Sequence, residues 1–454
     1  MSVNNKIKVF FISLGCAKNL VDSQIMTECI LNEGWEIVAD PENADIIVIN
    51  TCSFIQDAYK ESAETITEMR RLKEEGQCKG IVVSGCLPQR YSTTVHTRFP
   101  FVDAFLGPDH IMEITNVIKN IMDGQRNIIL AGETPSKIFE PSGKRRVVFS
   151  QGAYAYLKIA EGCNHFCSFC TIPSIRGRYR SRSIASIVRE AENLLSAGFR
   201  ELNLISQDTF SFGYDTGETI TDLLRALSKL GNEFWIRLLY GYPCGLTEEL
   251  LNVIAESDKI CRYFDIPIQH ASEKILKLMN RSHTVPFVKN MTERIRKILP
   301  NAVIRTTCIT GFPGETNKDF EELHKYIIEN QFDHLGVFVF SPEKDTKADS
   351  LPNRVTREEA EKRREILMLT QHDIMEKKHT SLVGKTDTLL VDSIEEGKRG
   401  RIKGRTMRFA PEIDGMVYIK KTNSAIKRGS FVPIIYTKLV DYDMEAEVFY
   451  EGRK

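Results

Sequence analysis

Short apolar segments that alternate with longer amphipathic ones constrain the fold of this chain more than any other feature. Near the start, residues 8–14, 46–49 and 80–84 have the length and composition of buried strands. Helical spacing follows the first two of them, over 20–34 and 56–75. Strand, turn and helix in this order are typical of a parallel sheet, whose functional residues gather at the carboxyl ends of its strands.

The same alternation continues through the middle of the chain. Six more strands, separated by helical stretches, are expected at 154–159, 201–205, 235–239, 263–266, 302–307 and 334–340. Six β/α units in succession favour a partial TIM-like barrel, with functional residues just after the strand ends. A charged helix over 357–378 closes this region.

The last part of the chain has a different pattern. Short β-prone runs with Gly and Asp between them are found at 386–391, 415–419, 431–436 and 446–450, which predicts a small all-β barrel. Upstream, residues 126–150 contain Pro135, Pro141, Gly143 and the basic run 144–146, which suits a linker. We therefore predict an α/β protein with a parallel-sheet domain over 1–125, a linker over 126–150, a partial (β/α)6 barrel over 151–380 and a β-barrel over 381–454.

Composition excludes several functional classes. The 454 residues carry 61 Lys and Arg against 61 Asp and Glu, so a mainly electrostatic nucleic-acid binder is not expected. No apolar run reaches the roughly 18 residues that span a bilayer, and the first residues lack the apolar core of a signal peptide. We expect a cytoplasmic protein with no membrane partner, in which the 11 cysteines are candidates for metal ligands or reactive thiols rather than disulfides.

Three cysteines lie close together directly after the first expected barrel strand. Cys163, Cys167 and Cys170 form a C-x3-C-x2-C motif. Three thiolates on so short a loop can hold three irons of a cubane 4Fe-4S cluster and leave the fourth iron open to a substrate or cofactor. A structural zinc site is the alternative, but zinc takes four ligands, usually from paired spacings, and His165 has little freedom to turn inward between two cysteines.

This motif, with Phe169 before its last cysteine, resembles that of the radical S-adenosylmethionine (SAM) enzymes, which share the partial barrel. The resemblance implies that SAM binds the open iron and is cleaved to a 5′-deoxyadenosyl radical, with Phe169 beside the adenine. It also implies SAM contacts at Ser206 and Gln207, at Gln269 and at Gly311, each near the end of a barrel strand. The simpler interpretation of Ser206 and Gln207 is a polar turn, and that of Gly311 is a Gly-Pro turn.

Three further cysteines, Cys16, Cys52 and Cys86, each follow an expected strand of the N-terminal region. They can meet at one edge of a parallel sheet. Together with the C-x3-C-x2-C motif they resemble the methylthiotransferase family, which carries an auxiliary 4Fe-4S cluster on three such cysteines and ends in a TRAM-type barrel. The resemblance covers the whole chain in this order and implies two 4Fe-4S clusters and SAM as cofactors.

Short strings favour the RimO type of this family, which modifies a ribosomal protein, over the tRNA-modifying MiaB type. The segment 16–23, CAKNLVDS, resembles the RimO form, and so do 206–209, 265–270 and 410–415. Three features depart from the RimO pattern. Gln24 stands where the family has Glu, Asp345 stands where a Gly precedes Thr346, and residues 381–454 carry 14 Lys and Arg against 11 Asp and Glu.

The RimO resemblance implies transfer of a methylthio group to the β-carbon of an aspartate in the small-subunit ribosomal protein S-twelve. Such a C–H bond has no acidic proton, so we assign no acid–base catalytic residue. The implied partners are that protein or the small ribosomal subunit, and an electron donor such as flavodoxin or ferredoxin. Two alternatives remain open: a tRNA adenosine methylthiotransferase, with tRNA as partner, and a non-catalytic, metal-stabilised RNA-binding protein.

Four arginines follow the cysteine loop, at 176, 178, 180 and 182. They are candidates for binding an anionic partner or the carboxylate of the cofactor. The alternative interpretation is a solvated surface, which is what most charge runs form.

Overall fold

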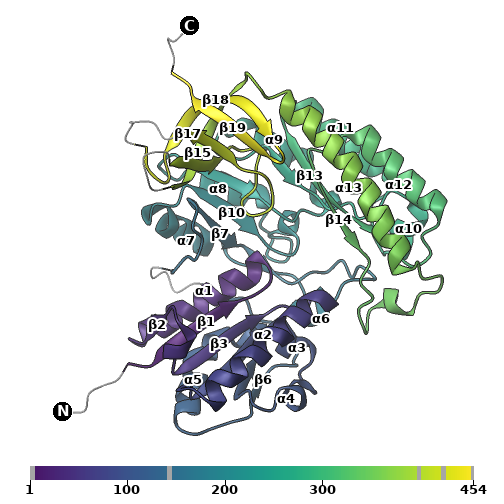
Figure 1. Cartoon of the computed structure of the whole chain (residues 1–454). Helices are drawn as coiled ribbons and strands as arrows, with labels where there is room; N and C mark the ends of the chain where they lie inside the picture. Colours follow the sequence, from purple (N-terminus) through teal and green to yellow (C-terminus); the bar gives the residue numbers. More distant parts are fainter. Residues whose placement is uncertain (1–5, 141–145, 396–399, 421–425, 451–454) are drawn as a thin grey trace. The chain divides into compact units, whose positions relative to one another are not determined.

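The computed structural model describes residues 6–140, 146–395, 400–420 and 426–450, and the chain folds into two compact units (Figure 1). The first unit consists of Met1–Phe149, Ala160–Arg182 and Ser341–Asp349. The second consists of Ser150–Ile159, Ser183–Phe340 and Ser350–Lys454. The chain therefore passes more than once between the two units.

The first unit is built on a six-stranded sheet in the order β2-β1-β3-β4-β5-β6, in which every pairing is parallel. The strands are β1 (Lys8–Ser13), β2 (Glu36–Val38), β3 (Ile46–Thr51), β4 (Gly80–Gly85), β5 (Ala104–Leu106) and β6 (Ile128–Leu130). Every residue of β3 and β4 is buried, as expected for strands that are covered on both faces.

Helices cover both faces of this sheet. On one face α2 (Gln56–Glu74) and α4 (Val95–Arg98) pack with Ile47 and Ile49 in one apolar core. Ile46 points to the other face, where it lies beside α5 (Ile114–Met122), which in turn packs with α1 (Ala17–Asn32). The short helix α3 (Cys86–Arg90) begins directly at the end of β4.

The segment that we expected to be a linker begins inside this sheet. Residues 128–130 form β6 and pair in parallel with β5, because three consecutive apolar residues extend the sheet by one strand. Of the basic run at 144–146, the first two residues lie outside the described part of the chain, and Arg146 is buried.

The second unit contains the partial barrel. Its six strands form two three-stranded parallel sheets, β7-β10-β11 and β12-β13-β14. Backbone hydrogen bonds connect β11 to the segment before β12: the amide of Ile236 donates to the carbonyl of Lys259, and the carbonyl of Ile236 accepts from the amide of Cys261. The strands are β7 (Tyr154–Lys158), β10 (Glu201–Ile205), β11 (Trp235–Leu238), β12 (Tyr263–Asp265), β13 (Val303–Thr310) and β14 (His334–Val339). The helices are α7 (Ile184–Ser196), α8 (Ile220–Ser228), α9 (Glu248–Glu256), α10 (Glu273–Leu278), α11 (Val285–Ile298), α12 (Asn317–Asn330) and α13 (Arg357–Thr380).

The chain ends in a closed five-stranded barrel with the order β15-β16-β17-β19-β18 (Figure 1, yellow). Its strands are β15 (Thr386–Ile394), β16 (Arg401–Arg405), β17 (Val417–Lys420), β18 (Phe431–Val440) and β19 (Asp443–Val448). We did not expect β16, because charged residues dominate its sequence. The expected fold class is confirmed: an α/β protein with an N-terminal parallel sheet, a partial barrel and a small β-barrel.

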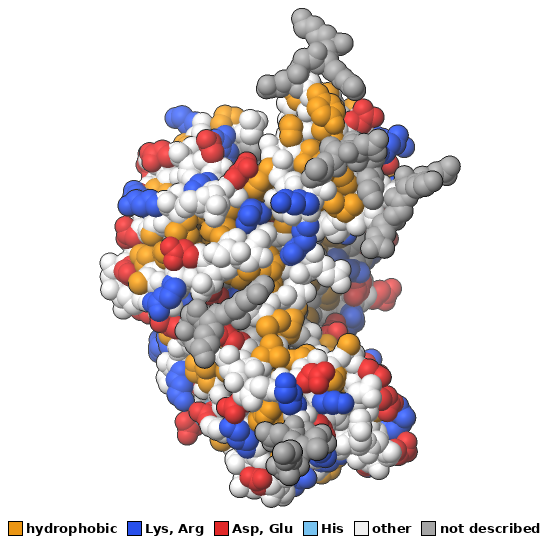
Figure 2. Space-filling model, turned by 90° about the vertical axis from the view of Figure 1, so that its left-hand side faces the viewer, with side chains coloured by type: hydrophobic (Ala, Val, Ile, Leu, Met, Phe, Trp, Pro, Cys, Tyr) orange, Lys and Arg blue, Asp and Glu red, His pale blue; other side chains and the backbone are white. Residues whose placement is uncertain are grey.

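Charges of both signs are distributed over the surface. Figure 2 shows Lys and Arg side chains interspersed with Asp and Glu on the face that it displays, in keeping with the equal totals. None of the described helices combines the length and the apolar character needed to cross a membrane.

Candidate iron–sulfur centre

β1, β3 and β4 are neighbours in the N-terminal sheet, and a cysteine follows the end of each. Asn50 on β3 is in register with Ser13 on β1 and with Ser84 on β4. Cys16 directly precedes α1, Cys52 directly follows β3, and Cys86 is the first residue of α3. The structure thus brings these three cysteines, the strand-end trio, to the same edge of the sheet.

Two glycines allow the three loops to approach one another. Gly15 has a φ of +90°, and a Cβ there would lie 2.6 Å from Cβ and 3.2 Å from Sγ of Cys52. Gly85 has a φ of +97°, and a Cβ there would lie 2.6 Å from the carbonyl oxygen of Thr51. Only glycine fits at such positions without strain, so the residue before Cys16 runs directly against Cys52.

The three thiols influence one another electrostatically. Burial, followed by the charges of Cys86 and Cys16, raises the pKa of Cys52 to about 12. Burial also raises the pKa of Cys86; Cys16 adds to this effect and Arg176 opposes it. The thiols of Cys52 and Cys86 therefore stay protonated at neutral pH unless a cation replaces their protons. Three neighbouring thiols of this kind are a donor set that suits iron in a cluster.

The spacing of the thiols differs from that of a single-ion site. Among the described residues, no three His, Cys, Asp or Glu side chains are close enough to chelate one metal ion. A cubane bonds each thiolate to a different iron, so its ligands stand further apart than those of a zinc ion. Three thiols at one edge of the sheet match the number of protein ligands that a 4Fe-4S cluster with one open iron requires.

A buried arginine lies beside the strand-end trio. Arg176 ends α6 (Ile172–Arg176), and 2% of it is exposed. Its Nη2 donates hydrogen bonds to Oδ1 of Asn19 and, over 3.4 Å, to Sγ of Cys86. Its Nη1 donates to Oδ2 of Asp22 at 2.7 Å and to Oε2 of Glu161 at 3.4 Å.

The other three arginines of this run have different surroundings. Arg182 is buried, and Arg180 donates to backbone carbonyls that include those of Lys137 and Pro135. Arg178 is exposed and lies over the ring of Phe166, 5.3 Å from its centre. A solvated basic surface is therefore wrong for half of the run, since Arg176 and Arg182 are buried.

The second set of cysteines, the loop trio of Cys163, Cys167 and Cys170, belongs to the same unit. All three are half-buried. The amide of Cys163 donates to the carbonyl of Gly177 at 3.2 Å, and the hydroxyl of Thr171, after the last cysteine, donates to the carbonyl of Phe54. Because Phe54 follows Cys52 by two residues, the cysteine loop and one loop of the strand-end trio are in direct contact.

Sequence analysis missed the polar face of α1. Lys18, Asn19, Asp22 and Ser23 are buried, although the helix was predicted from the spacing of its apolar residues alone. Nδ2 of Asn19 donates to the carbonyls of Leu14 and Thr51, which turns Oδ1 toward Arg176. The available signal was the spacing of these polar residues, which places them on one side of the helix next to Cys16.

Two of the residues proposed to contact SAM, Ser206 and Gln207, follow β10 in the second unit. The hydroxyl of Ser206 is fully buried and accepts a hydrogen bond from the amide of Asp208 at 3.1 Å. Asp208 then accepts from the amides of Phe210 and Tyr242. Ser206 thus belongs to a polar turn, which is the simpler of the two interpretations given for it from the sequence.

Gln269 follows β12 and has a different character. Its backbone is in the left-handed region, with a φ of +70°, and is held by hydrogen bonds to Thr307 and Ile309 of β13. Its Oε1 is buried without a hydrogen-bond partner. A strained backbone and an unsatisfied buried oxygen are features of a ligand site. Neighbouring His270 accepts a hydrogen bond on Nδ1 from the amide of Ser272.

Gly311 follows β13 and has a φ of +74°. A Cβ at this position would lie 2.3 Å from Cβ of Ala360 on α13. The absence of a side chain at Gly311 therefore lets α13 pack closely against the residue that follows β13. Phe169 belongs to the first unit, and Ser206, Gln207, Gln269 and Gly311 belong to the second.

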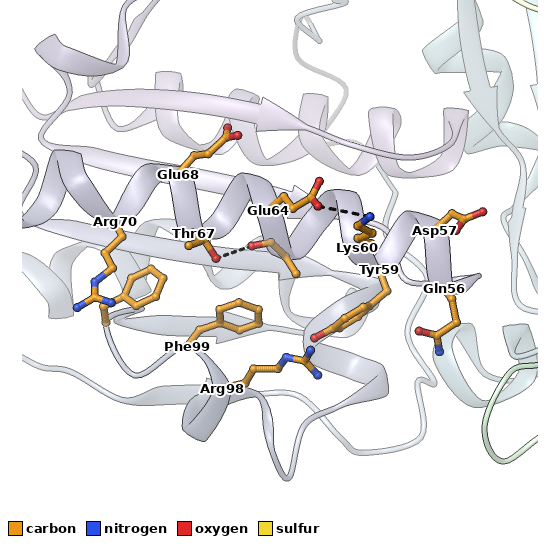
Figure 3. Close-up of a pocket in the computed structure, with 12 residues that line it drawn as sticks. Gln56, Asp57, Tyr59, Lys60, Glu64, Thr67, Glu68, Arg70, Arg98 and Phe99 are labelled. Carbon is orange, nitrogen blue, oxygen red and sulfur yellow. Dashed lines mark hydrogen bonds and ion pairs between the residues drawn. The ribbon is translucent and has the colours of Figure 1, made fainter.

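A groove on the first unit runs along α2 (Figure 3). Its lining has charges of both signs, with Asp57, Glu64 and Glu68 against Lys60, Arg70 and Arg98. The guanidinium of Arg98 lies over the ring of Tyr59, 4.7 Å from its centre. No cysteine is among its lining residues, so this groove is a feature separate from the cysteine sites.

Comparison with family models divides the chain into three consecutive matches. Residues 8–107 match the uncharacterized protein family UPF0004, residues 157–327 match the radical SAM superfamily, and residues 383–449 match the TRAM domain. The six cysteines are contained in the first two matches.

Similarity to curated proteins extends over nearly the whole chain. The chain is 41% identical to the ribosomal protein uS12 methylthiotransferase RimO of Clostridioides difficile, over 98% of this chain and 99% of that protein. It is 42% identical to the protein of the same name from Syntrophus aciditrophicus, over 97% of this chain and 98% of that protein. This chain belongs to the RimO family of radical SAM methylthiotransferases. As a member of the RimO family, it uses SAM and iron–sulfur clusters.

Solved structures support the fold of this RimO family member. The radical SAM methyltransferase TsrM of Kitasatospora setae, with cobalamin and a 4Fe-4S cluster bound, superimposes with a TM-score of 0.58 at 16% identity, over 76% of this chain and 77% of that one. The cobalamin-dependent radical SAM enzyme OxsB gives a TM-score of 0.53 at 13% identity, over 82% of this chain and 56% of that one. At these identities the likeness shows the fold alone.

Proposed function

We propose that this chain attaches a methylthio group to the β-carbon of an aspartate in ribosomal protein uS12, with two 4Fe-4S clusters and two molecules of SAM. The names of its curated relatives support uS12 as the substrate. The observation that carries the proposal is that both cysteine trios lie in one compact unit, where the loops that carry them are in contact.

Each trio holds one cluster in this proposal. The loop trio binds the cluster whose open iron takes SAM, and the strand-end trio binds the second cluster. When bound, the clusters and SAM supply the electron, the methyl group and the hydrogen-abstracting radical that the reaction needs. The protein contributes six thiols, of which those of Cys52 and Cys86 are buried, and Phe169 beside the adenine. The further SAM contacts are Ser206, Gln207, Gln269 and Gly311.

The proposal assigns the cluster domain to 1–125 together with β6, a linker to the rest of 126–150, the radical SAM domain to 151–380 and the TRAM domain to 381–454. The electron comes from a small donor protein of the flavodoxin or ferredoxin type. The reaction takes place in the cytoplasm, on uS12 or on the small ribosomal subunit that contains it.

A deletion strain tests the substrate. Mass spectrometry of uS12 and of digested tRNA is compared before and after deletion of the gene. We expect the methylthio mass to disappear from uS12 and to remain unchanged in tRNA, and to return on complementation with the wild-type chain but not with Cys163→Ala. Loss from tRNA with uS12 unchanged would reject the choice of substrate.

Iron analysis tests the two cluster sites. After anaerobic purification we expect about eight irons per chain, and about four when either trio is replaced by alanine. Cys244→Ser is the matched control, because Cys244 is exposed and outside both trios. Stoichiometric zinc in place of iron would contradict the proposal.

A further inference from the structure

Arg176 connects the two cysteine trios of the first unit. In the sequence it comes six residues after Cys170, on the helix that follows the loop trio. In space its Nη2 is 3.4 Å from Sγ of Cys86, which belongs to the strand-end trio. One side chain thus links the segment that carries one set of thiols to a member of the other set.

The position of this guanidinium group is fixed from several sides. Nη1 is bound to Asp22, on α1, and to Glu161, on β8 (Ala160–Glu161). Nη2 is bound to Oδ1 of Asn19, whose own amide group is held by two backbone carbonyls. Since a guanidinium has N–H groups in a rigid planar fork, these partners leave one N–H of Nη2 directed at the sulfur.

The surroundings also keep the arginine charged and dry. The exposed fractions are 2% for Arg176, 2% for Asp22 and 4% for Glu161. A buried cation between two buried carboxylates is strongly held, because removing it leaves both carboxylates without a counter-charge. In such a site a hydrogen bond from a charged donor to a thiolate is stronger than it is in water.

From this geometry we infer that Arg176 is a positioning residue that donates a hydrogen bond to the Cys86 thiolate and thereby raises the reduction potential of the cluster on Cys16, Cys52 and Cys86. The inference rests on the proposed cluster at these cysteines. One-electron reduction adds one negative charge to a 4Fe-4S cluster. A hydrogen bond to a ligating sulfur stabilises the reduced cluster more than the oxidised one, so it raises the reduction potential. Hydrogen bonds to the sulfurs are among the determinants of such potentials.

The test measures the potential of this cluster alone. Full-length protein in which Cys163, Cys167 and Cys170 are replaced by alanine is reconstituted anaerobically, and its midpoint potential is measured by titration with dithionite while the reduced cluster is followed by electron paramagnetic resonance. Two variants are compared in this background. Arg176→Lys keeps the charge but loses the fork, and Arg176→Met with Asp22→Asn removes the donor while the net charge of the site stays the same.

We expect the midpoint potential to shift to more negative values in both variants, with the larger shift in the double variant. Asp103→Asn is the control for a loss of stability alone. Asp103 is 1% exposed and forms an ion pair with Lys73 of α2. It directly precedes β5 and so lies at the amino ends of the strands, opposite the edge that carries the cysteines. Its substitution is expected to lower the unfolding temperature without moving the potential.

Two results would overturn the inference. The first is an unchanged potential in an Arg176 variant that holds its iron, and the second is an equal shift in Asp103→Asn. Absence of iron from the background protein with Arg176 intact is a different result: it would reject the proposed cluster itself, and the inference with it.

Discussion

Arg405 of the terminal β-barrel and Glu201 of the partial barrel form a fully buried ion pair within the second unit. Arg405 also binds Asp392 through Nε at 2.7 Å, and Arg237 donates to Glu201 at 2.6 Å. Burial would raise the pKa of Glu201, but the charges of Arg237 and Arg405 overcome this effect and lower it. Four charges shared in this way attach the small barrel to strands β10 and β11.

Replacement of Arg405 by methionine is expected to destabilise the second unit by about 3–5 kcal/mol, because Asp392 loses its guanidinium partner and Glu201 loses one of two. Urea unfolding of the apo-protein, followed by circular dichroism, measures the change. Arg401→Met on the same strand is the control, since Arg401 is exposed and its loss is expected to cost no more than about 0.5 kcal/mol. Similar midpoints for the two variants would contradict a role of the network in stability.

His379, near the end of α13, predicts a dependence of stability on pH. Burial, with the charges of His334 and Arg408, lowers its pKa to about 4 from an ordinary 6.5. Between these values the unfolded chain binds a proton that the folded chain does not, so stability is fully present above pH 6.5 and decreases as the pH falls toward 4.

Wild-type apo-protein is therefore expected to lose about 2 kcal/mol more than His379→Gln between pH 7 and pH 5. Urea midpoints at the two pH values give the comparison. His372→Gln, on the same helix at a half-buried position, is expected to keep the wild-type dependence. The same dependence in His379→Gln as in wild type would show that another group is responsible.

Gly15→Ala and Gly34→Ala separate backbone strain from crowding at the strand-end trio. Both glycines have a positive φ, of +90° and +79°, so each alanine is expected to cost about 1–2 kcal/mol in backbone strain. A Cβ at Gly34 meets nothing within 4 Å, whereas one at Gly15 meets Cys52. We expect iron per chain to fall from about eight to about four in Gly15→Ala alone. Full iron in that variant would mean that the Cys52 loop can move aside.

Gly311→Ala is expected to destabilise the second unit, because the new Cβ would lie 2.3 Å from Cβ of Ala360. Ala360→Gly in the same chain should restore the part of the loss that comes from this clash, while the strain of a positive φ remains. Thermal unfolding of the two single variants and the double variant measures the coupling. Purely additive effects would show that the two residues do not compete for space.

The sequence was sufficient to predict those parts of the fold whose strands are apolar. Residues 46–49 and 80–84 were recognised because strands buried on both faces contain little but aliphatic side chains. β16 was missed because its sequence, RIKGR, is mostly charged. Only the structure shows that Arg405 is buried against Glu201 on a segment 204 residues away.

The candidate site was predictable to a similar extent. The rule that parallel strands place their carboxyl ends at one edge was enough to bring Cys16, Cys52 and Cys86 together. The role of Arg176 could not be predicted in this way, because its partners Asn19 and Asp22 lie more than 150 residues earlier in the chain. Nothing in a basic run distinguishes an arginine that turns inward from one that faces water.

The first unit is assembled from three separate stretches of chain, and this has a consequence for biosynthesis. Glu343, in the last stretch, forms a buried ion pair with Arg90, in the first, and accepts a hydrogen bond from the amide of Gln56 at the start of α2. During translation, residues 1–149 emerge long before residues 341–349. The unit therefore reaches its final form only when three quarters of the polypeptide has been synthesised. Any metal that binds earlier binds to a unit that still lacks residues 341–349.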